Sequence, residues 1–207
     1  MNAIQPYAVI MDNLDGAAIL KKIEQCGRVC YKSEDKTTED SAEKFVGNII
    51  KRGHEAVLEH ESFTVKFVVD RGVSHELVRH RLASFCQEST RYCNYSKDDF
   101  DSEITFILPF FLDYKSPGWN AWQAAMKSAE DAYFKMLDIG HSPQEARSVL
   151  PNSLKTEVVM TCNIREWRHF FKLRTADAAH PQMREITRPL LDELKTIIPV
   201  VFDDINY

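Results

Sequence analysis

The sequence predicts an α+β fold in which a central antiparallel or mixed sheet is flanked by helices. Two stretches, residues 62–69 and 156–162, alternate apolar and polar side chains with the period of a half-buried strand. A third stretch, residues 117–139, repeats aromatic and apolar side chains every three or four positions and predicts the longest helix. No linker is long enough to separate two domains, so we expect residues 1–207 to form a single domain.

In the N-terminal part, a strand or extended arm and two helices are expected before the first alternating stretch. The arm covers residues 1–12, and residues 14–31 carry the apolar stripe of a helix. Thr37-x-x-Asp40 has the form of a variant capping box for the second helix. Gly53 is expected to end that helix, because glycine is the usual residue just after a helix.

After the strand at 62–69, the chain is expected to turn at residues 70–72 and to enter a short helix over 75–80 that is capped by Ser74. Residues 83–92 are expected to be extended. With a period of two, Gln87, Ser89 and Arg91 would then share one face of the strand.

The C-terminal half predicts a loop, a short strand and several helices. A polar loop is expected over 94–103 and an apolar strand over 104–108. Ser142-Pro143-Gln144-Glu145 is a capping box with proline at the first helical position. A further helix is expected over 163–174, and Pro181 is expected to start the last one.

The composition excludes several classes of protein. The net charge is −5 and the pI is about 5.8, which argues against a binder of polymeric nucleic acid and favours a single nucleotide. No run of eighteen apolar residues and no secretory signal are present, so we expect no membrane partner and a cytoplasmic location. Five cysteines without a CxxC pair are typical of reduced, mostly buried cytosolic thiols.

The most informative segment runs from Arg79 to Arg91 and contains three arginines, one histidine and two serines. Arginine presents a planar fork of donors that suits phosphate oxygens and carboxylates, so the cluster indicates an anion-binding site. The structural alternative is a basic surface paired with acidic neighbours, since exposed ion pairs are common.

The spacing Arg79-His80-Arg81, seven residues, Ser89, one residue, Arg91 resembles the signature of the flavin-dependent thymidylate synthases. These enzymes methylate dUMP to dTMP with methylenetetrahydrofolate, FAD and NADPH. The segments 146–151, 163–165 and 173–182 also resemble segments of that family. The resemblance implies a homotetramer whose sites are each assembled from several subunits.

The resemblance also implies roles for individual residues. The catalytic positions it suggests are Arg174, Ser89 and His54. The positions that match dUMP contacts are Glu76, Arg79, Gln87, Glu88, Ser89, Thr90, Arg91, Arg147 and Arg174. The positions that match FAD contacts are Arg79, His80, Arg81, Gln87, Asn163, Arg165 and His169.

Four positions depart from the common pattern of the family. Glu76 stands where glutamine is usual, and Gln87 replaces a frequent glutamate. His169 occupies a place often held by asparagine, and Ala56 replaces a threonine or serine near the flavin phosphate.

The segment 54–60 contains two histidines and invites a metal interpretation. His54 and His60 are six residues apart, which is about 240° around a helix, so the two side chains diverge and no metal site is expected. Instead, His54, Glu59 and His60 match a His-x4-Glu-His element that lines the flavin and folate end of the site in the family.

Ser89 has two possible roles. It could add to C6 of the pyrimidine as a nucleophile, but no base with an orienting partner is evident for it in the sequence, and we favour a hydrogen-bonding role. Two other functions remain open. One is a phosphohydrolase or phosphotransferase that uses His80, and the other is a flavin or nucleotide sensor without turnover.

Overall fold

The computed structural model describes residues 1–93, 95 and 103–207. Of the polar loop expected over 94–103, residues 94 and 96–102 lie outside the described residues.

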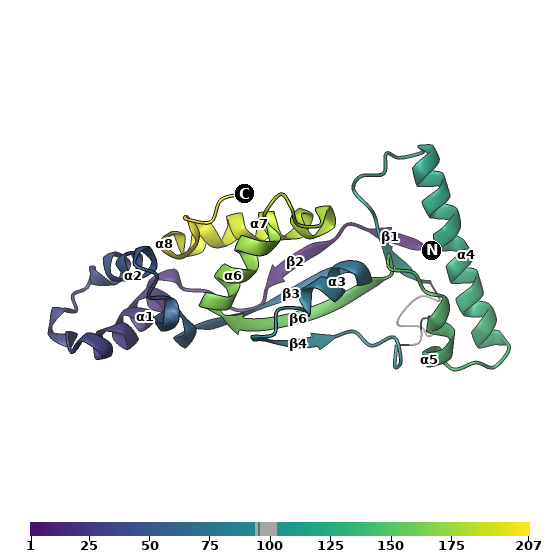
Figure 1. Ribbon diagram of the computed structural model, residues 1–207. Coiled ribbons are helices and arrows are strands. Elements are labelled where there is room, and N and C mark those ends of the chain that lie inside the picture. The colour runs from purple at the N-terminus through teal and green to yellow at the C-terminus, as the bar shows by residue number, and fades with distance from the viewer. Residues whose placement is uncertain (94, 96–102) are drawn as a thin grey trace. The chain divides into compact units, whose positions relative to one another are not determined.

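The described chain contains both helices and strands, as the sequence predicts (Figure 1). The strands are β1 (Asn2–Ile4), β2 (Tyr7–Ile10), β3 (Ser62–Asp70), β4 (Ala83–Gln87), β5 (Thr105–Ile107) and β6 (Lys155–Asn163). The helices are α1 (Gly16–Tyr31), α2 (Ser41–Lys51), α3 (Arg71–Leu77), α4 (Pro117–Asp138), α5 (Pro143–Ala146), α6 (Ile164–Arg174), α7 (Pro181–Ile197) and α8 (Pro199–Phe202). Short 3₁₀ helices cover Glu34–Lys36, Glu55–His60 and Arg147–Val149.

The main sheet is antiparallel and has four strands in the order β2-β3-β6-β4, while β1 and β5 form a separate parallel pair. β6 alternates perfectly between buried and half-buried residues, because successive side chains of a strand point to opposite faces. Thr64 of β3 and Thr161 of β6 lie opposite each other, with their hydroxyl oxygens 2.9 Å apart. The α+β class and the central antiparallel sheet are therefore confirmed.

The chain divides into two compact units, each built from several segments. The first comprises Met1–Tyr7, Phe67–Arg79 and Cys86–Val158, and the second comprises Ala8–Lys66, His80–Phe85 and Val159–Tyr207. Strands β3 and β6 contribute residues to both units. The expectation of a single domain over 1–207 stays a prediction.

The core of the first unit forms around α4, the longest helix in Figure 1. The Ser116 hydroxyl accepts a hydrogen bond of 3.1 Å from the Trp119 amide and caps the helix, as its sequence predicts. The core cluster consists of Tyr95, Ile104, Phe106, Met126, Tyr133, Ala146 and Leu154. The aromatic stripe of α4 therefore packs largely within this unit.

The core of the second unit is aromatic and centres on Trp167 of α6. Its ring stacks on Phe63 at a centroid distance of 4.8 Å and also contacts Phe170 and Phe171. The Trp167 indole N–H donates a hydrogen bond of 3.1 Å to the carbonyl oxygen of Phe63, so α6 is fixed to β3 by both packing and a polar contact.

Two local predictions around the arginine-rich segment are wrong. The short helix begins at Arg71 rather than at residue 75, because the Asp70 carboxylate accepts a hydrogen bond of 2.8 Å from the Val73 amide and acts as the cap in place of Ser74. β4 ends at Gln87 rather than at residue 92. The Ser89 carbonyl accepts hydrogen bonds from the amides of residues 92 and 93, which folds the chain into a turn.

Two further predictions need correction. The capping box at Thr37 does not form: α2 begins after Asp40, whose side chain makes no cap hydrogen bond. Instead, the Ser41 hydroxyl accepts a hydrogen bond from the Thr38 amide. The cysteines are not mostly buried, since Cys162 is buried while the other four are exposed or half-buried. All five cysteines are free thiols.

None of the helices in the described part of the chain is both long enough and apolar enough to cross a membrane.

A buried ion-pair network joins α6 to the C-terminal segment within the second unit. The Arg168 side chain is 1% exposed; it lies 3.0 Å from Glu55 Oε1 and 2.7 Å from Asp204 Oδ1, and it also donates to the Val201 carbonyl. A buried charge with such partners is costly to disturb, because its removal leaves carboxylates without compensation.

We therefore expect Arg168→Ala to lower the free energy of unfolding by about 3 kcal/mol, measured by urea denaturation. Lys22→Ala is the control, because it removes an ion pair with Glu61 in which the lysine is half exposed. That change should cost less than about 1 kcal/mol. Equal losses for the two variants would contradict the importance of the buried network.

Candidate active site

The structure places the residues suggested for the site in two groups, one in each compact unit. The first unit contains Glu76, Arg79, Gln87, Glu88, Ser89, Thr90, Arg91 and Arg147. The second unit contains His54, His80, Arg81, Asn163, Arg165, His169 and Arg174.

A pocket of about 630 Å³ lies in the second unit, within the size range of ligand sites. Of the residues suggested for the flavin, it is lined by Asn163, Arg165 and His169. Glu59, which belongs to the family element noted above, also lines it. The pocket is also lined by four residues that the sequence did not suggest, namely Glu55, Leu82, Glu166 and Lys172.

The polar wall of this pocket is one edge of α6. Asn163 ends β6 and caps α6, since its side-chain oxygen accepts a hydrogen bond of 2.9 Å from the Glu166 amide. Because neighbours on a helical face are three or four residues apart, Glu166, His169 and Lys172 follow along the same edge. This regular spacing is the signal that could have placed Glu166 and Lys172 on the same edge of α6 as His169, although it gives no sign of the contact between Glu166 and His80.

The cations of the pocket are paired with carboxylates but remain accessible. Arg165 Nη1 lies 2.5 Å from Glu59 Oε1, and both side chains are about half exposed. Lys172 Nζ lies 3.8 Å from Glu55 Oε1. Exposed pairs of this kind contribute little to stability, so each cation can turn to an anionic ligand at small cost.

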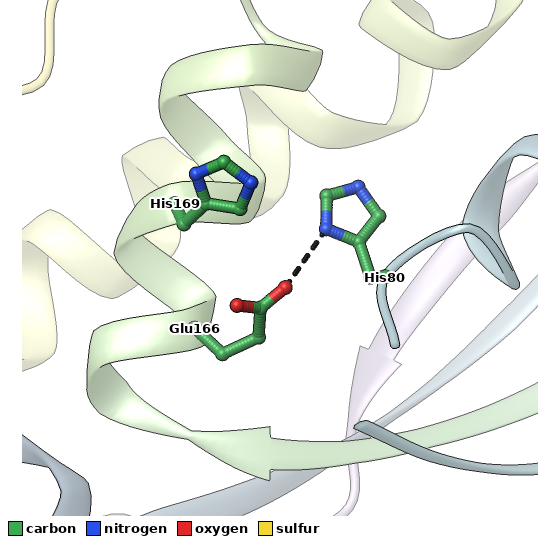
Figure 2. Close-up of side chains that lie close together, drawn as sticks. All are labelled: His80, Glu166 and His169. Atoms are coloured by element: carbon green, nitrogen blue, oxygen red, sulfur yellow. Dashed lines mark hydrogen bonds and ion pairs between the residues drawn. The ribbon is translucent and has the colours of Figure 1, made fainter. Parts of the chain in front are cut away.

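A chain of hydrogen bonds runs along the α6 edge from Glu166 through His80 to Arg174. Figure 2 shows the carboxylate of Glu166 facing the imidazole of His80, and Nδ1 lies 3.0 Å from Oε1. On the other side of the ring, Arg174 Nε donates to His80 Nε2 over 3.1 Å. Guanidinium nitrogens are donors only, so Nε2 must be the acceptor and the proton of the neutral ring must be on Nδ1.

The surroundings of His80 keep it neutral. The residue is 4% exposed, and burial lowers the pKa of His80 below the ordinary value of 6.5. The charge of Arg174 lowers this pKa further, while the hydrogen bond with Glu166 acts in the opposite direction. The ring also packs edge-on against Phe170 at a centroid distance of 4.9 Å.

The three side chains in Figure 2, His80, Glu166 and His169, have ligand atoms within 4.8 Å of one another, which raises the question of a metal site. A metal ligand needs a free lone pair on an imidazole nitrogen. Both nitrogens of His80 are already hydrogen-bonded, and one partner is the cation of Arg174. The arrangement therefore fits a device that orients Arg174 better than a metal centre.

In the first unit, Gln87 is fixed at the end of β4 by two hydroxyl groups. Its amide nitrogen donates to Ser74 Oγ over 3.0 Å and to Thr156 Oγ1 over 3.3 Å. Arg71 Nη1 is 3.5 Å from the same Thr156 oxygen. This use of the Gln87 side chain requires a donor, which a glutamate at this position would lack.

Glu88 and Thr90, on either side of Ser89, contact basic residues. Glu88 Oε2 lies 3.0 Å from Lys155 Nζ. Arg147 Nη1 donates to the hydroxyl of Thr90 over 3.1 Å, although the two residues are 57 positions apart in the sequence. The structure thus brings Arg147 to the turn at 89–92.

The Ser89 hydroxyl accepts a hydrogen bond of 3.3 Å from the Arg91 amide. Among the described residues, no histidine or carboxylate forms a hydrogen bond with this hydroxyl. Ser89 therefore lies in a turn, and none of the described histidines or carboxylates is hydrogen-bonded to it as a general base would be.

Some of the suggested residues lie apart from these contacts. His54 is exposed and does not line the 630 Å³ pocket. Its Nδ1 lies 3.1 Å from the hydroxyl of Tyr31, beside a different pocket. Arg79 and Arg81 are exposed, and in the described part of the chain their side chains form no hydrogen bond or ion pair.

The position of His80 predicts a specific dependence of stability on pH. Because its pKa is lower in the folded protein than 6.5, the unfolded chain binds more protons as the pH falls below that value. The contribution of neutral His80 to the free energy of unfolding is therefore fully present above pH 6.5 and is lost as the pH falls below that value. We expect the wild-type protein to lose up to about 1.4 kcal/mol per pH unit more than a His80→Gln variant. Urea denaturation between pH 7 and pH 5 measures this difference, and parallel curves for the two proteins would contradict it.

Comparison with known proteins places this arrangement in a family. A family model described as "Thymidylate synthase complementing protein" matches residues 15–200. A flavin-dependent thymidylate synthase of Geobacter sulfurreducens is 34% identical over 184 residues, which are 86% of this chain and 78% of that protein. One of Pyrococcus furiosus is 33% identical over 173 residues, which are 83% of this chain and 70% of that protein.

The fold is also found in a solved structure. A UMP/dUMP methylase from Streptomyces cacaoi, bound with 5-Br dUMP, matches with a TM-score of 0.78 at 24% identity, over 98% of this chain and 96% of that one. Since the family model spans nearly the whole chain and the two relatives match over most of their length, the chain belongs to the flavin-dependent thymidylate synthases, a family of enzymes.

Proposed function

We propose that this chain converts dUMP to dTMP, with methylenetetrahydrofolate as the carbon donor and FAD, reduced by NADPH, as the source of hydride. The observation that carries the proposal is the 630 Å³ pocket beside the Glu166–His80–Arg174 chain, which combines residues suggested for the flavin with the arginine suggested for the pyrimidine. The cytoplasmic location expected from the sequence stays a prediction.

The chemistry of the pocket fits a flavin nucleotide. Leu82 lines it although this residue is 75% exposed, so a flat apolar ring would cover a surface that is otherwise in contact with water. Arg165 and Lys172 supply cations for the phosphates, and Asn163 and His169 supply hydrogen-bonding groups. When bound, the flavin supplies the hydride chemistry, and the protein supplies position and electrostatic field.

The residues of the first unit fit the nucleotide substrate. We assign the phosphate of dUMP to Arg91 and Arg147 and to the backbone of the turn that contains Ser89 and Thr90. Arg147 reaches that turn through Thr90, which supports a shared role in binding one anion. Glu76, Arg79, Gln87 and Glu88 complete the assigned set.

Arg174 is proposed to act on the pyrimidine itself. Negative charge develops on the ring as N3 ionises and C5 becomes nucleophilic, and a fixed cation beside it stabilises that charge. The hydrogen bond from Nε to His80 restricts the orientation of the guanidinium group. Catalysis benefits from such preorganisation, because no reorientation is needed during the reaction.

We propose that copies of the chain assemble into a homotetramer with shared sites. β2 is an edge strand of the main sheet, and apolar side chains are exposed at Tyr7 and Val9 of β2 and at Met11 just after it. Apolar residues on an unpaired edge are a liability for an isolated chain and are typical of a contact between subunits. Leu82 and Leu173 add exposed apolar surface in the second unit.

The proposed function predicts that the purified protein is yellow, that NADPH bleaches its colour, and that it releases tritium from dUMP labelled at C5 when folate is present. Arg174→Ala should lower kcat at least about 100-fold, which is close to the value of a single donor that stabilises developing charge. Arg188→Ala is the matched control, since it removes a guanidinium of the same unit that pairs with the exposed Asp177.

A protein that binds flavin but releases no tritium would contradict the synthase and favour a sensor. A colourless protein that hydrolyses phosphate esters would favour the hydrolase.

A separate prediction concerns Ser89. If this residue positions dUMP through hydrogen bonds, Ser89→Ala should keep measurable activity with a rate reduced about 10- to 100-fold, because one neutral hydrogen-bonding group is lost. Single-turnover measurements at saturating dUMP test this. Complete loss of turnover with unchanged dUMP affinity would instead indicate a nucleophile.

A further inference from the structure

A second pocket, of about 270 Å³, lies in the second unit between α1, α2 and the 3₁₀ helix at Glu34–Lys36, and we call it the α1–α2 pocket. It shares no lining residue with the 630 Å³ pocket. The linings of the two pockets include residues that are adjacent in the sequence, because His54 lines the α1–α2 pocket and Glu55 lines the larger one.

The lining of the α1–α2 pocket is basic. Arg28, Lys36, Arg52 and His54 contribute to it, and none of the described aspartates or glutamates does. This is unusual in a chain with a formal net charge of −5. Pockets lined by one sign of charge concentrate ligands of the opposite sign, so the lining indicates an anion.

The basic residues differ in how their charge is compensated. Arg28 is 9% exposed and is neutralised by Glu24, whose Oε1 lies 2.6 Å from its Nη2. In contrast, within the part of the chain that the structure describes, no carboxylate forms an ion pair with Lys36 or Arg52. These two exposed cations are therefore available to a ligand at the mouth of the pocket.

The remaining wall is flat and aromatic. The Phe45 ring lies under the guanidinium of Arg28, with 4.8 Å from Cζ to the ring centroid. It reaches this position because α1 has Gly27 there, where a Cβ atom would come within 2.6 Å of the ring. Tyr31, at the end of α1, also lines the pocket, and its hydroxyl is hydrogen-bonded to His54. A pocket with an aromatic wall and a cationic mouth fits a planar or aliphatic arm that ends in an anion.

We propose that the α1–α2 pocket binds the anionic end of a co-substrate, with Arg52 as its principal contact. This rests on the proposed function, which supplies two molecules of the required chemistry. The folate carries a tail of glutamate carboxylates, and NADPH carries a phosphate on its adenosine ribose. The residues that line the two pockets are adjacent in the chain at His54 and Glu55, so the α1–α2 pocket lies next to the proposed flavin site.

Binding measurements on the full-length protein test the proposal without turnover. Isothermal titration calorimetry would compare pteroyltriglutamate with pteroylmonoglutamate, and adenosine 2′,5′-bisphosphate with adenosine 5′-monophosphate. In one of these two pairs, the more highly charged ligand should bind more tightly than its less charged counterpart. Arg52→Ala should weaken that ligand about tenfold, which corresponds to 1.4 kcal/mol, and should leave the less charged one unchanged.

Lys51→Ala is the matched control. Lys51 is an exposed neighbour of Arg52 that does not line the pocket, and its replacement by alanine removes one positive charge, as Arg52→Ala does. It should change affinity by less than about twofold, as expected for long-range screened charge. A thermal melt of each variant establishes that it is folded.

Each outcome decides a point. Selective loss of triglutamate affinity in Arg52→Ala supports the pocket with the folate tail as its ligand, and selective loss of bisphosphate affinity supports it with the dinucleotide. No discrimination within either pair, or equal weakening by Lys51→Ala, overturns the proposal. Retained binding in a protein that releases no tritium from dUMP would overturn the proposed function and leave the pocket intact.

Discussion

The junction between β6 and α6 is the constraint on which the second unit depends. Asn163 ends the strand and caps the helix, so the direction of the sheet fixes where the first turn of α6 begins. Trp167 then anchors that turn to β3 through its ring and its indole nitrogen. Since helical positions are about 100° apart, these two contacts determine that Glu166 and His169 lie along the pocket.

The 630 Å³ pocket and the α1–α2 pocket differ in how the charges of their basic residues are compensated. In the larger pocket each cation has a nearby carboxylate, as in Arg165 with Glu59. Such pairing reduces repulsion in the absence of ligand while it keeps the cation close to the cavity. In the α1–α2 pocket the buried Arg28 is paired with Glu24, while Arg52 is exposed and forms no ion pair with any carboxylate among the residues that the structure describes. The desolvation cost explains the difference, because a buried charge needs a partner and an exposed one does not.

Most of the fold could be predicted from the sequence, since its strongest signals are local. The alternation in β6, the capping box at Ser142 and the cap at Asn163 each depend on residues within a few positions, and all three are present. The start of α3 cannot be predicted in this way, because Asp70 and Ser74 are both good capping residues and the structure uses Asp70. The end of β4 was misplaced because backbone hydrogen bonds to Ser89 leave no trace in side-chain periodicity.

The candidate site was predictable to a smaller extent. The resemblance suggested His80, Asn163, Arg165 and His169, but it did not suggest Glu166, which contacts His80, a residue 86 positions away. Contacts at such separations cannot be derived from spacing along one element. The same limit applies to Arg147 and Thr90, which the resemblance named but which only the fold brings together.

The hydrogen bonds on both ring nitrogens of His80 also make this residue unsuited to phosphoryl transfer or proton relay. A histidine that accepts a phosphoryl group, or that relays protons, needs one ring nitrogen able to leave its partner and meet the substrate. Here the only lone pair points at the Nε–H of a guanidinium, and the opposite proton is given to a carboxylate. A phosphohistidine at this position would require both contacts to break in a nearly dry environment, which makes His80 a poor centre for phosphoryl transfer.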